Sequence, residues 1–188
     1  MYFLVKENSA DLLNCERLKK TAKKGFCLAQ LGFFLLTMNS DIKNIKKLII
    51  RESLELDCGQ IIKNFPLAYE TYGTLNKSKS NAILAFHALT GDQFVTGINP
   101  ITKREGWWTF AVGPDKAIDT KKYFVICANV LGGCMGSFGP KEIDPKTNKV
   151  FGTTFPVITI KDIVKAQKFL LDFLGIKKLL AVTGGSMG

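Results

Sequence analysis

Residues 179–188 read LLAVTGGSMG, a short apolar run that passes directly into a glycine-rich turn. The run at residues 179–183 has the length and composition of a β-strand buried on both faces. The residues after it spell G-x-S-x-G, in which the glycines on either side of Ser186 leave room for a sharp turn. An ordinary Gly/Ser turn is the alternative. The position directly after a buried strand favours a nucleophile turn, which lifts the serine hydroxyl clear of the sheet.

A predicted helix and another apolar run precede this turn. Thr159 and Asp162 form a capping-box pattern, and Gly175 ends the helix. The run at residues 123–130 lies before the helix, and the run at residues 179–183 lies after it. Two buried strands joined by a helix make a βαβ unit, which requires a parallel sheet. Residues spaced by three and four form the expected inner face of the helix, namely Ile163, Val164, Gln167, Leu170, Leu171 and Leu174.

Three further runs are predicted to be strands. Residues 82–86 (AILAF) are continuously apolar, which is typical of a strand buried on both faces. Residues 54–56 and 65–72 (FPLAYETY) are short β-like runs, and a turn at residues 73–76 ends the second. The fold class is therefore α/β, with no internal repeat and no second domain.

The composition is that of a globular chain. Of 188 residues, 46% are hydrophobic and 22% charged, which excludes a disordered tail, a collagen-like repeat and a small disulfide-stapled scaffold. The net charge of +10 comes from scattered lysines without a nucleic-acid motif, so we interpret them as solvated side chains. The five cysteines form no C-x-x-C pair and have no histidine nearby, which predicts free thiols in a reducing cytosol and no metal site.

The first 37 residues differ from the rest of the chain. Four lysines at positions 19–24 precede the apolar run FCLAQLGFFLL at residues 26–36, as in a secretory signal peptide. The run is too short to span a bilayer and no small-x-small cleavage site follows it. We therefore expect residues 1–37 to be an extension outside the fold, with Met38 as a second possible start and residues 38–188 as the folded portion.

The chain contains a single histidine, His87, which opens the sequence HALTG directly after residues 82–86. This histidine could act as a base for Ser186, or it could order the loop that it opens. G-x-S-x-G after a strand is typical of the α/β-hydrolase fold, in which the catalytic base follows the nucleophile along the chain. We therefore predict that His87 orders its loop through hydrogen bonds and that the triad base is absent from this chain.

A second glycine-rich stretch, LGGCMGSFGP at residues 131–140, also follows a predicted strand. Its glycines do not have the spacing of a dinucleotide fingerprint, and no phosphate-binding G-x-x-x-x-G-K-[ST] occurs in the chain. Cys134 could be a nucleophile, but no base is placed near it. We expect an active-site loop whose backbone packs closely.

Six blocks of sequence occur in order along the chain: LAYETYGTLN (67–76), NAILAFHALTGD (81–92), GWW (106–108), GPDKAIDTKKYFVICANVLGGC (113–134), FPVITIKDIVKAQKFLLDFLGI (155–176) and GGSMG (184–188). Together they resemble the homoserine O-acetyltransferase family of the α/β-hydrolase superfamily. The resemblance implies an α/β-hydrolase fold, of which this chain holds the N-terminal part of the sheet and stops just after the strand and nucleophile turn.

The resemblance also implies a reaction. Ser186 would take an acetyl group from acetyl-CoA and pass it to the hydroxyl of L-homoserine, a step of methionine biosynthesis. The backbone amides of Leu89 and Met187 would form the oxyanion hole. The triad Asp and His would lie in the part of the family sequence that has no counterpart here. The family implies a cytoplasmic enzyme, a homodimer at full length, with acetyl-CoA as co-substrate, no bound cofactor or metal, and no nucleic-acid or membrane partner.

Two positions depart from the family pattern. Phe138 stands where a small hydroxyl residue is expected, and Arg104 does not match the arginine that holds the homoserine carboxylate. Because the triad base is absent, we expect no measurable transferase activity from the polypeptide as given, and an exposed sheet edge prone to association. The alternatives are an inactive remnant of an interrupted gene, an α/β-hydrolase esterase, and a homoserine or serine O-succinyltransferase. The choice between an acetyl and a succinyl donor stays open.

Overall fold

The computed structural model describes residues 45–188, which all fall within one compact unit, Met38–Gly188. The extension predicted at residues 1–37, and with it the boundary at Met38, lies outside the described residues. No helix among residues 45–188 combines the length and the apolar character that a membrane crossing needs.

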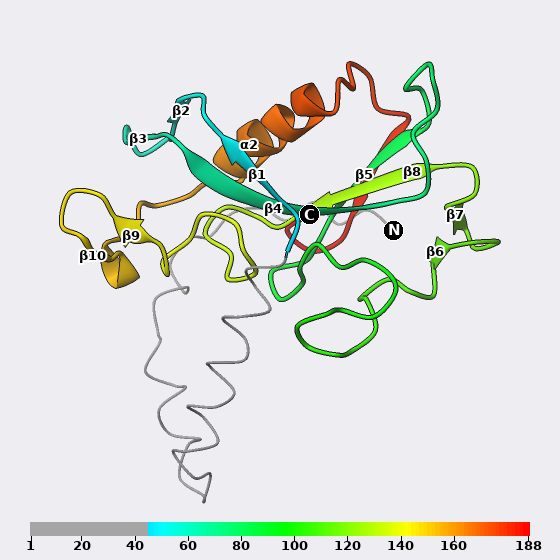
Figure 1. Ribbon diagram of the computed structural model, residues 1–188, viewed down its shortest axis with the longest axis horizontal. Helices are drawn as coiled ribbons and strands as arrows, with labels where there is room; N and C mark the ends of the chain where they lie inside the picture. Colours follow the sequence, from blue (N-terminus) through cyan, green and yellow to red (C-terminus); the bar gives the residue numbers. More distant parts are fainter. Residues whose placement is uncertain (1–44) are drawn as a thin grey trace, which may run out of the picture. The chain divides into compact units, whose positions relative to one another are not determined.

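A five-stranded mixed sheet, in the order β1-β4-β8-β5-β11, organises the described residues (Figure 1). β4 (Phe65–Tyr72) pairs antiparallel with β1 (Lys47–Ile50) on one side and with β8 (Phe124–Ala128) on the other. β5 (Ala82–Phe86) pairs parallel with β8 and with β11 (Ala181–Gly184). The other elements are the ladders β2 (Leu54–Glu55) with β3 (Ile61–Ile62), β6 (Val112–Gly113) with β7 (Ile118–Asp119), and β9 (Ile143–Asp144) with β10 (Lys149–Val150), the 3₁₀ helix η2 (Gly152–Thr154) and α2 (Ile160–Phe173).

The helix α2 connects β8 to β11, so the predicted βαβ unit is confirmed. Its capping box is present: Asp162 N–H donates to the Thr159 hydroxyl at 3.2 Å, and Thr159 N–H donates to the Asp162 carboxylate at 3.0 Å. Gly175 follows the helix with a φ of +68°, as predicted for its end. One inner-face residue was predicted wrongly, because Val164 is 50% exposed. The buried stripe of α2 consists of Asp162, Ile163, Ala166, Gln167 and Leu170.

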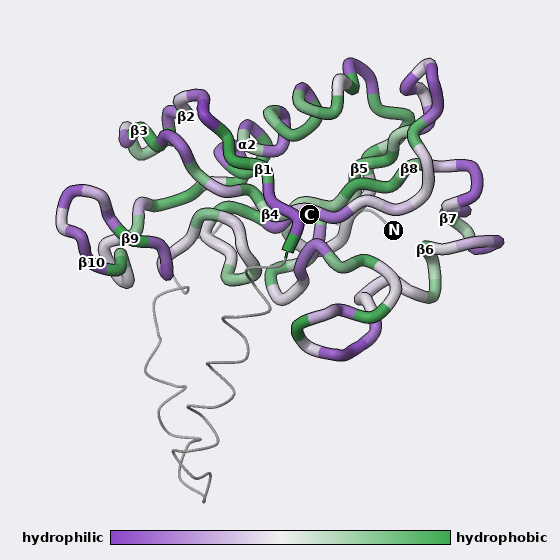
Figure 2. The backbone as a smooth tube through the Cα atoms, in the orientation of Figure 1, coloured by the Kyte–Doolittle hydropathy of each residue, from purple (hydrophilic) through white to green (hydrophobic). Residues whose placement is uncertain are grey.

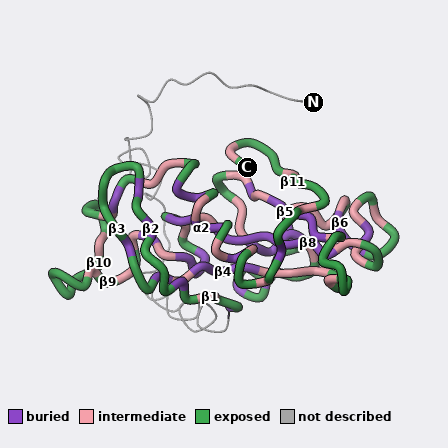
Figure 3. The backbone as a smooth tube through the Cα atoms, turned by 90° about the horizontal axis from the view of Figure 1, so that it is seen from above, coloured by how far each residue is buried: buried purple, intermediate pink, exposed green. Residues whose placement is uncertain are grey.

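The two faces of the sheet pack against different partners. Alternate residues of β5 and β8, such as Leu84 and Ile126, join a core with Leu170 of α2. The residues between them, such as Ala85 and Val125, pack against the loops that cover the opposite face. The central strands are therefore apolar (Figure 2) and buried on both faces (Figure 3), as predicted for residues 82–86.

The last strand is shifted along the sequence relative to its prediction at residues 179–183. Gly184 pairs with Phe86 of β5, so the first glycine of the G-x-S-x-G motif ends the strand. Leu180 N–H donates to the carbonyl oxygen of Ala82 at 2.8 Å and leads into β11. Within residues 45–188, β11 pairs only with β5, and Val182 is 60% exposed. The expected exposed sheet edge is therefore present in the described part of the chain.

Candidate active site

Ser186 lies in a tight turn directly after β11. Its φ of +66° places the backbone in the left-handed region, which costs a residue with a side chain roughly 1–2 kcal/mol. Gly188 N–H donates to the Gly185 carbonyl at 3.2 Å and closes the turn around Ser186. The serine is exposed. Backbone strain and exposure together match the turn that the motif predicts.

The glycines at both ends of the motif lie against β5. A Cβ atom at Gly184 would lie 2.5 Å from the carbonyl carbon of Gly188 and 3.0 Å from the Cβ of Phe86. A Cβ atom at Gly188 would lie 2.6 Å from the Phe86 carbonyl oxygen. Because these contacts are shorter than side-chain carbons tolerate, the two backbones can approach only with glycine at both positions.

The HALTG segment begins where β5 ends, next to this turn. Gly91 N–H donates to the Ala88 carbonyl at 2.8 Å and forms a second tight turn, in which Leu89 is 66% exposed. In the described part of the chain, no acceptor binds the amide N–H of Leu89 or of Met187. The structure therefore brings two exposed turns with free amide donors to the same end of adjacent parallel strands.

His87 connects the end of β5 to the residues that follow β8. Its Nδ1 lies 2.7 Å from the Ala88 carbonyl oxygen, and Val130 N–H donates to Nε2 at 3.2 Å. Since Nε2 accepts a hydrogen bond, the proton resides on Nδ1, which donates to Ala88. Burial lowers the pKa of His87 below 6.5, while the Ala88 hydrogen bond and the nearby Asp92 oppose the shift.

The role predicted for His87, ordering its loop through hydrogen bonds, is therefore confirmed. The side chain is only 1% exposed and both ring nitrogens are engaged by backbone groups. A general base needs a free nitrogen within hydrogen-bond reach of the nucleophile. His87 has no free nitrogen to offer Ser186.

Asp92, for which no sequence pattern predicts a role, fixes the far side of the same loop. Its carboxylate accepts hydrogen bonds from Phe94 N–H at 2.8 Å and from the Asn99 side-chain amide at 2.8 Å. Its carbonyl accepts a hydrogen bond from the Trp107 indole at 2.8 Å. Burial raises the pKa of Asp92, against the effect of these donors and of His87. Its place in the block NAILAFHALTGD was the only signal available in the sequence.

The glycine-rich stretch at residues 131–140 packs closely, as expected. A Cβ atom at Gly133 would lie 2.5 Å from the side-chain oxygen of Asn129. Ser137 is buried, and its hydroxyl donates to the Asn129 carbonyl at 2.6 Å and accepts from Ala68 N–H at 3.0 Å. The Ser137 hydroxyl therefore ties this loop to β4.

Phe138 belongs to an aromatic cluster. Its ring centroid lies 6.1 Å from that of Phe65, 5.7 Å from that of Phe151 and 5.1 Å from that of Phe155. Where the family pattern has a small hydroxyl residue, this chain therefore has an aromatic ring that packs against β4 and the segment before α2.

An apolar hollow of about 300 Å³ adjoins the serine turn. Its walls come from the end of β5, the first turns of α2 and the serine turn itself, namely Phe86, His87, Val130, Ile160, Ile163, Val164, Met187 and Gly188. Met187 therefore has its side chain in an apolar surrounding while the neighbouring Ser186 is exposed.

Two other predicted candidates lie apart from this arrangement. Cys134 is an exposed free thiol. Arg104 is exposed and accepts a hydrogen bond from Asn99 N–H through its carbonyl. Within residues 45–188, no three His, Cys, Asp or Glu side chains gather as metal ligands would.

Two curated relatives of the chain carry the same protein name. A homoserine O-acetyltransferase from Pelagibacter ubique is 71% identical over 151 residues, which is 80% of this chain and 40% of that protein. A second from Methanohalobium evestigatum is 59% identical over 139 residues, or 74% of this chain and 28% of that protein. The chain belongs to the homoserine O-acetyltransferase family. It spans less than half the length of these relatives, and no family model matches it.

Solved structures of the same fold support the assignment. The crystal structure of homoserine O-acetyltransferase from Bacillus anthracis has a TM-score of 0.70 and 37% identity, over 76% of this chain and 40% of that one. Esterase E22 has a TM-score of 0.68 and 38% identity, over 77% of this chain and 40% of that one. The predicted α/β-hydrolase fold is therefore confirmed over the part that this chain spans.

We expect the pKa of His87 to lie below 6.5, because burial disfavours the imidazolium. Since the chain has one histidine, the ¹⁵N spectrum of the imidazole reports this group alone. It should show the Nδ1–H tautomer, and less than half of the imidazole should be protonated at pH 6.5.

The same shift predicts a pH dependence of stability. Around and below pH 6.5, down to the lowered pKa of the folded state, the unfolded chain binds more protons at this histidine than the folded chain does. The free energy of unfolding therefore decreases as the pH is lowered through this range. The variant His87→Gln should lack this component of the slope. A pKa at or above 6.5 would contradict the burial of His87. An Nε2–H tautomer would contradict the hydrogen bond from Val130 N–H.

The substitution Gly184→Ala should destabilise the protein, whereas Gly185→Ala should not. A Cβ at Gly184 meets backbone atoms, whereas none lies within 4 Å of a Cβ at Gly185. We expect Gly184→Ala to lower the free energy of unfolding by about 1–3 kcal/mol and Gly185→Ala to change it by less than about 0.5 kcal/mol. Urea unfolding followed by circular dichroism measures both. Equal effects would show that the backbones are not in close contact.

Proposed function

We propose that Ser186 is the nucleophile of an acetyl transfer from acetyl-CoA to the hydroxyl of L-homoserine. The observation that carries the proposal is the strained, exposed serine at the end of β11, beside the turn that contains Leu89. The names of the relatives supply the acyl group and the acceptor. In the pathway that the resemblance implies, the product serves methionine biosynthesis.

The first step would form an acetyl-serine. The Ser186 hydroxyl oxygen attacks the thioester carbonyl as its proton passes to a base, and the carbonyl oxygen becomes an oxyanion. The amides of Leu89 and Met187, which have no acceptor among residues 45–188, would donate hydrogen bonds to that oxyanion. Collapse of the intermediate releases the thiolate of coenzyme A, which takes up a proton.

The second step would transfer the acetyl group to the acceptor and regenerate the free Ser186 hydroxyl. The hydroxyl of L-homoserine loses its proton to the base and attacks the acetyl carbonyl, and Ser186 leaves with a proton. His87 does not supply the base, because Nε2 accepts the Val130 amide. We assign the base to a part of the longer relatives that this chain does not match. On this assignment, the 188-residue chain alone should not turn over.

The proposal includes two properties that the resemblance implies. One is a cytoplasmic location, which the free thiols Cys58, Cys127 and Cys134 support, because thiols stay reduced there. The other is a homodimer in the full-length form.

A graft tests the function. The segment of the Pelagibacter ubique relative that matches this chain is replaced by the corresponding part of this chain, at 71% identity. The grafted enzyme should form O-acetylhomoserine from acetyl-CoA and L-homoserine, as measured by mass spectrometry. Ser186→Ala should lower kcat at least about a thousandfold.

Ser53→Ala, at an exposed serine near β2, is the matched control and should leave kcat unchanged. Release of free acetate in place of O-acetylhomoserine would identify an esterase, and O-succinylhomoserine formed from succinyl-CoA would identify a succinyltransferase. Full activity of Ser186→Ala would overturn the proposal.

Leu89→Pro tests the oxyanion hole in the same graft. Proline removes the amide proton and suits this position of a tight turn, where Gly91 donates the closing hydrogen bond. We expect kcat to fall roughly 100- to 1,000-fold. Leu89→Ala keeps the amide and should stay within about threefold of the parent. Similar losses in both variants would assign the effect to the side chain.

A further inference from the structure

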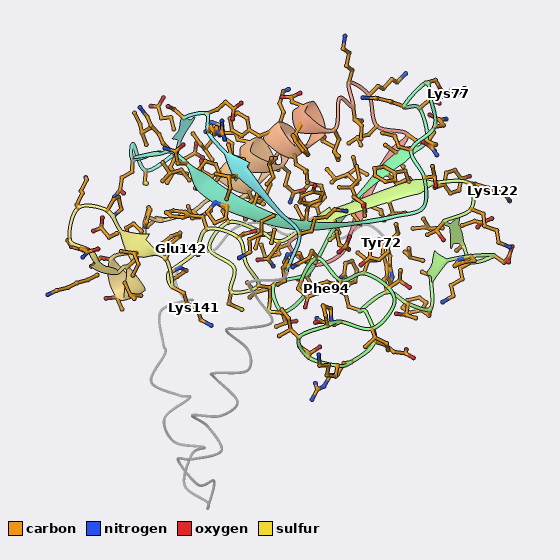
Figure 4. All side chains as sticks on the ribbon, in the orientation of Figure 1. Tyr72, Lys77, Phe94, Lys122, Lys141 and Glu142 are labelled. Carbon is orange, nitrogen blue, oxygen red and sulfur yellow. The ribbon has the colours of Figure 1, made fainter. Side chains whose placement is uncertain are left out.

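A basic cavity of about 640 Å³ lies at the end of β11 opposite Ser186. One wall is the loop between β4 and β5, and the other is the segment between α2 and β11. Figure 4 shows Lys77 on the first loop, beside the second segment. The lining residues are Lys77, Ser78, Lys79, Ser80, Gly175, Lys177, Lys178, Leu179 and Leu180.

The charges in this cavity are not compensated. Its lining contains four lysines and no acidic residue. Lys79 donates to the Leu174 carbonyl at 2.9 Å, but Lys77, Lys177 and Lys178 have no hydrogen-bonding or ion-pair partner within residues 45–188. Asp172, one turn earlier on α2, already pairs with Lys168 at 2.8 Å. Three lysines without an ion-pair partner among residues 45–188 therefore line one hollow that has no acidic residue in its wall.

Hydrogen bonds hold the first wall in place. The side-chain oxygen of Asn76 accepts from Ser80 N–H at 2.9 Å and from the Ser78 hydroxyl at 3.2 Å. Asn81 donates to the carbonyls of Thr74 and Lys122, both at 2.9 Å. These internal hydrogen bonds preform the loop that carries Lys77, so its conformation does not depend on a ligand.

The second wall is fixed to the same frame. Ile176 is buried, and its N–H donates to the Leu171 carbonyl at 2.9 Å, so the chain leaves α2 in one direction. Leu180 N–H donates to the Ala82 carbonyl at 2.8 Å. Lys79 spans the two walls through its bond to Leu174. The spacing between the lysines of the two walls is therefore set by the fold.

We propose that this cavity binds a small ligand that carries a diphosphate group. Its volume is that of a small-molecule site, and lysine ammonium groups bind phosphate oxygens as point charges. The serine hydroxyls add neutral donors, and Leu179 with Leu180 offers an apolar wall to an organic substituent. Inorganic diphosphate and an organic diphosphate share the phosphate oxygens that these lysines would bind.

Calorimetric titration of the 188-residue chain tests the proposal, with inorganic pyrophosphate and ADP as separate probes. At least one should bind with one-to-one stoichiometry, and tighter binding of ADP would assign the site to organic diphosphates. The double variant K177A/K178A should weaken binding at least about tenfold. Lys77→Ala, on the opposite wall, should weaken it about threefold or more.

The control K146A/K149A removes the same charge at the β9–β10 hairpin, where both lysines are exposed. It should change affinity less than about twofold. Equal weakening by control and cavity variants would show attraction by net charge alone and overturn the proposal. So would binding of neither probe, or binding of a short RNA without binding of pyrophosphate or ADP.

Discussion

At the end of β11, the backbone of Gly184 lies against Phe86 of β5, and Gly188 comes back to the Phe86 carbonyl. Only glycine at both positions allows this approach. The approach forces the chain to reverse within the residues between them, and Ser186 takes the positive φ of that reversal. The exposed hydroxyl is therefore a consequence of how closely two parallel strands pack.

The same end of the sheet is stiffened from the other side of β5. His87 links the end of β5 to Val130 after β8, and Asp92 with Trp107 holds the segment that follows. Neither residue needs to react with a substrate for its position to matter. Together they keep the turn that contains Leu89 beside the serine turn, so two amide donors are oriented without reorganisation of the chain.

Local patterns in the sequence predicted the central elements well. Residues 82–86 form β5 as predicted, because a continuous apolar run can be buried only inside the sheet. The capping box and Gly175 predicted both ends of α2, because the residues that cap a helix lie within a few positions of its ends in the sequence. Features that depend on distant contacts were not predicted. β1 was missed because a run of only four residues, of which Ile50 alone is buried, becomes a strand only through pairing with β4.

The residues of the candidate site show the same division between local patterns and distant contacts. The motif itself predicted the turn at Ser186, but the role of Asp92 depends on Asn99 and Trp107, whose positions require the folded loop. The basic cavity has no sequence pattern at all. Lys77 and Lys178 lie far apart in the chain and line the same cavity only because β5 pairs with β11.

The position of β5 also sets the order in which the serine turn can be assembled. Ile83 pairs with Val125 on one side and with Ala181 on the other, and the second pairing joins residues roughly one hundred positions apart in the sequence. Contacts of such long sequence separation form slowly and late in folding. A chain caught before β11 docks has no close approach to Phe86 and hence no strained serine. The strained turn at Ser186 thus exists only after β11 has paired with β5, and its formation reports that this pairing is complete.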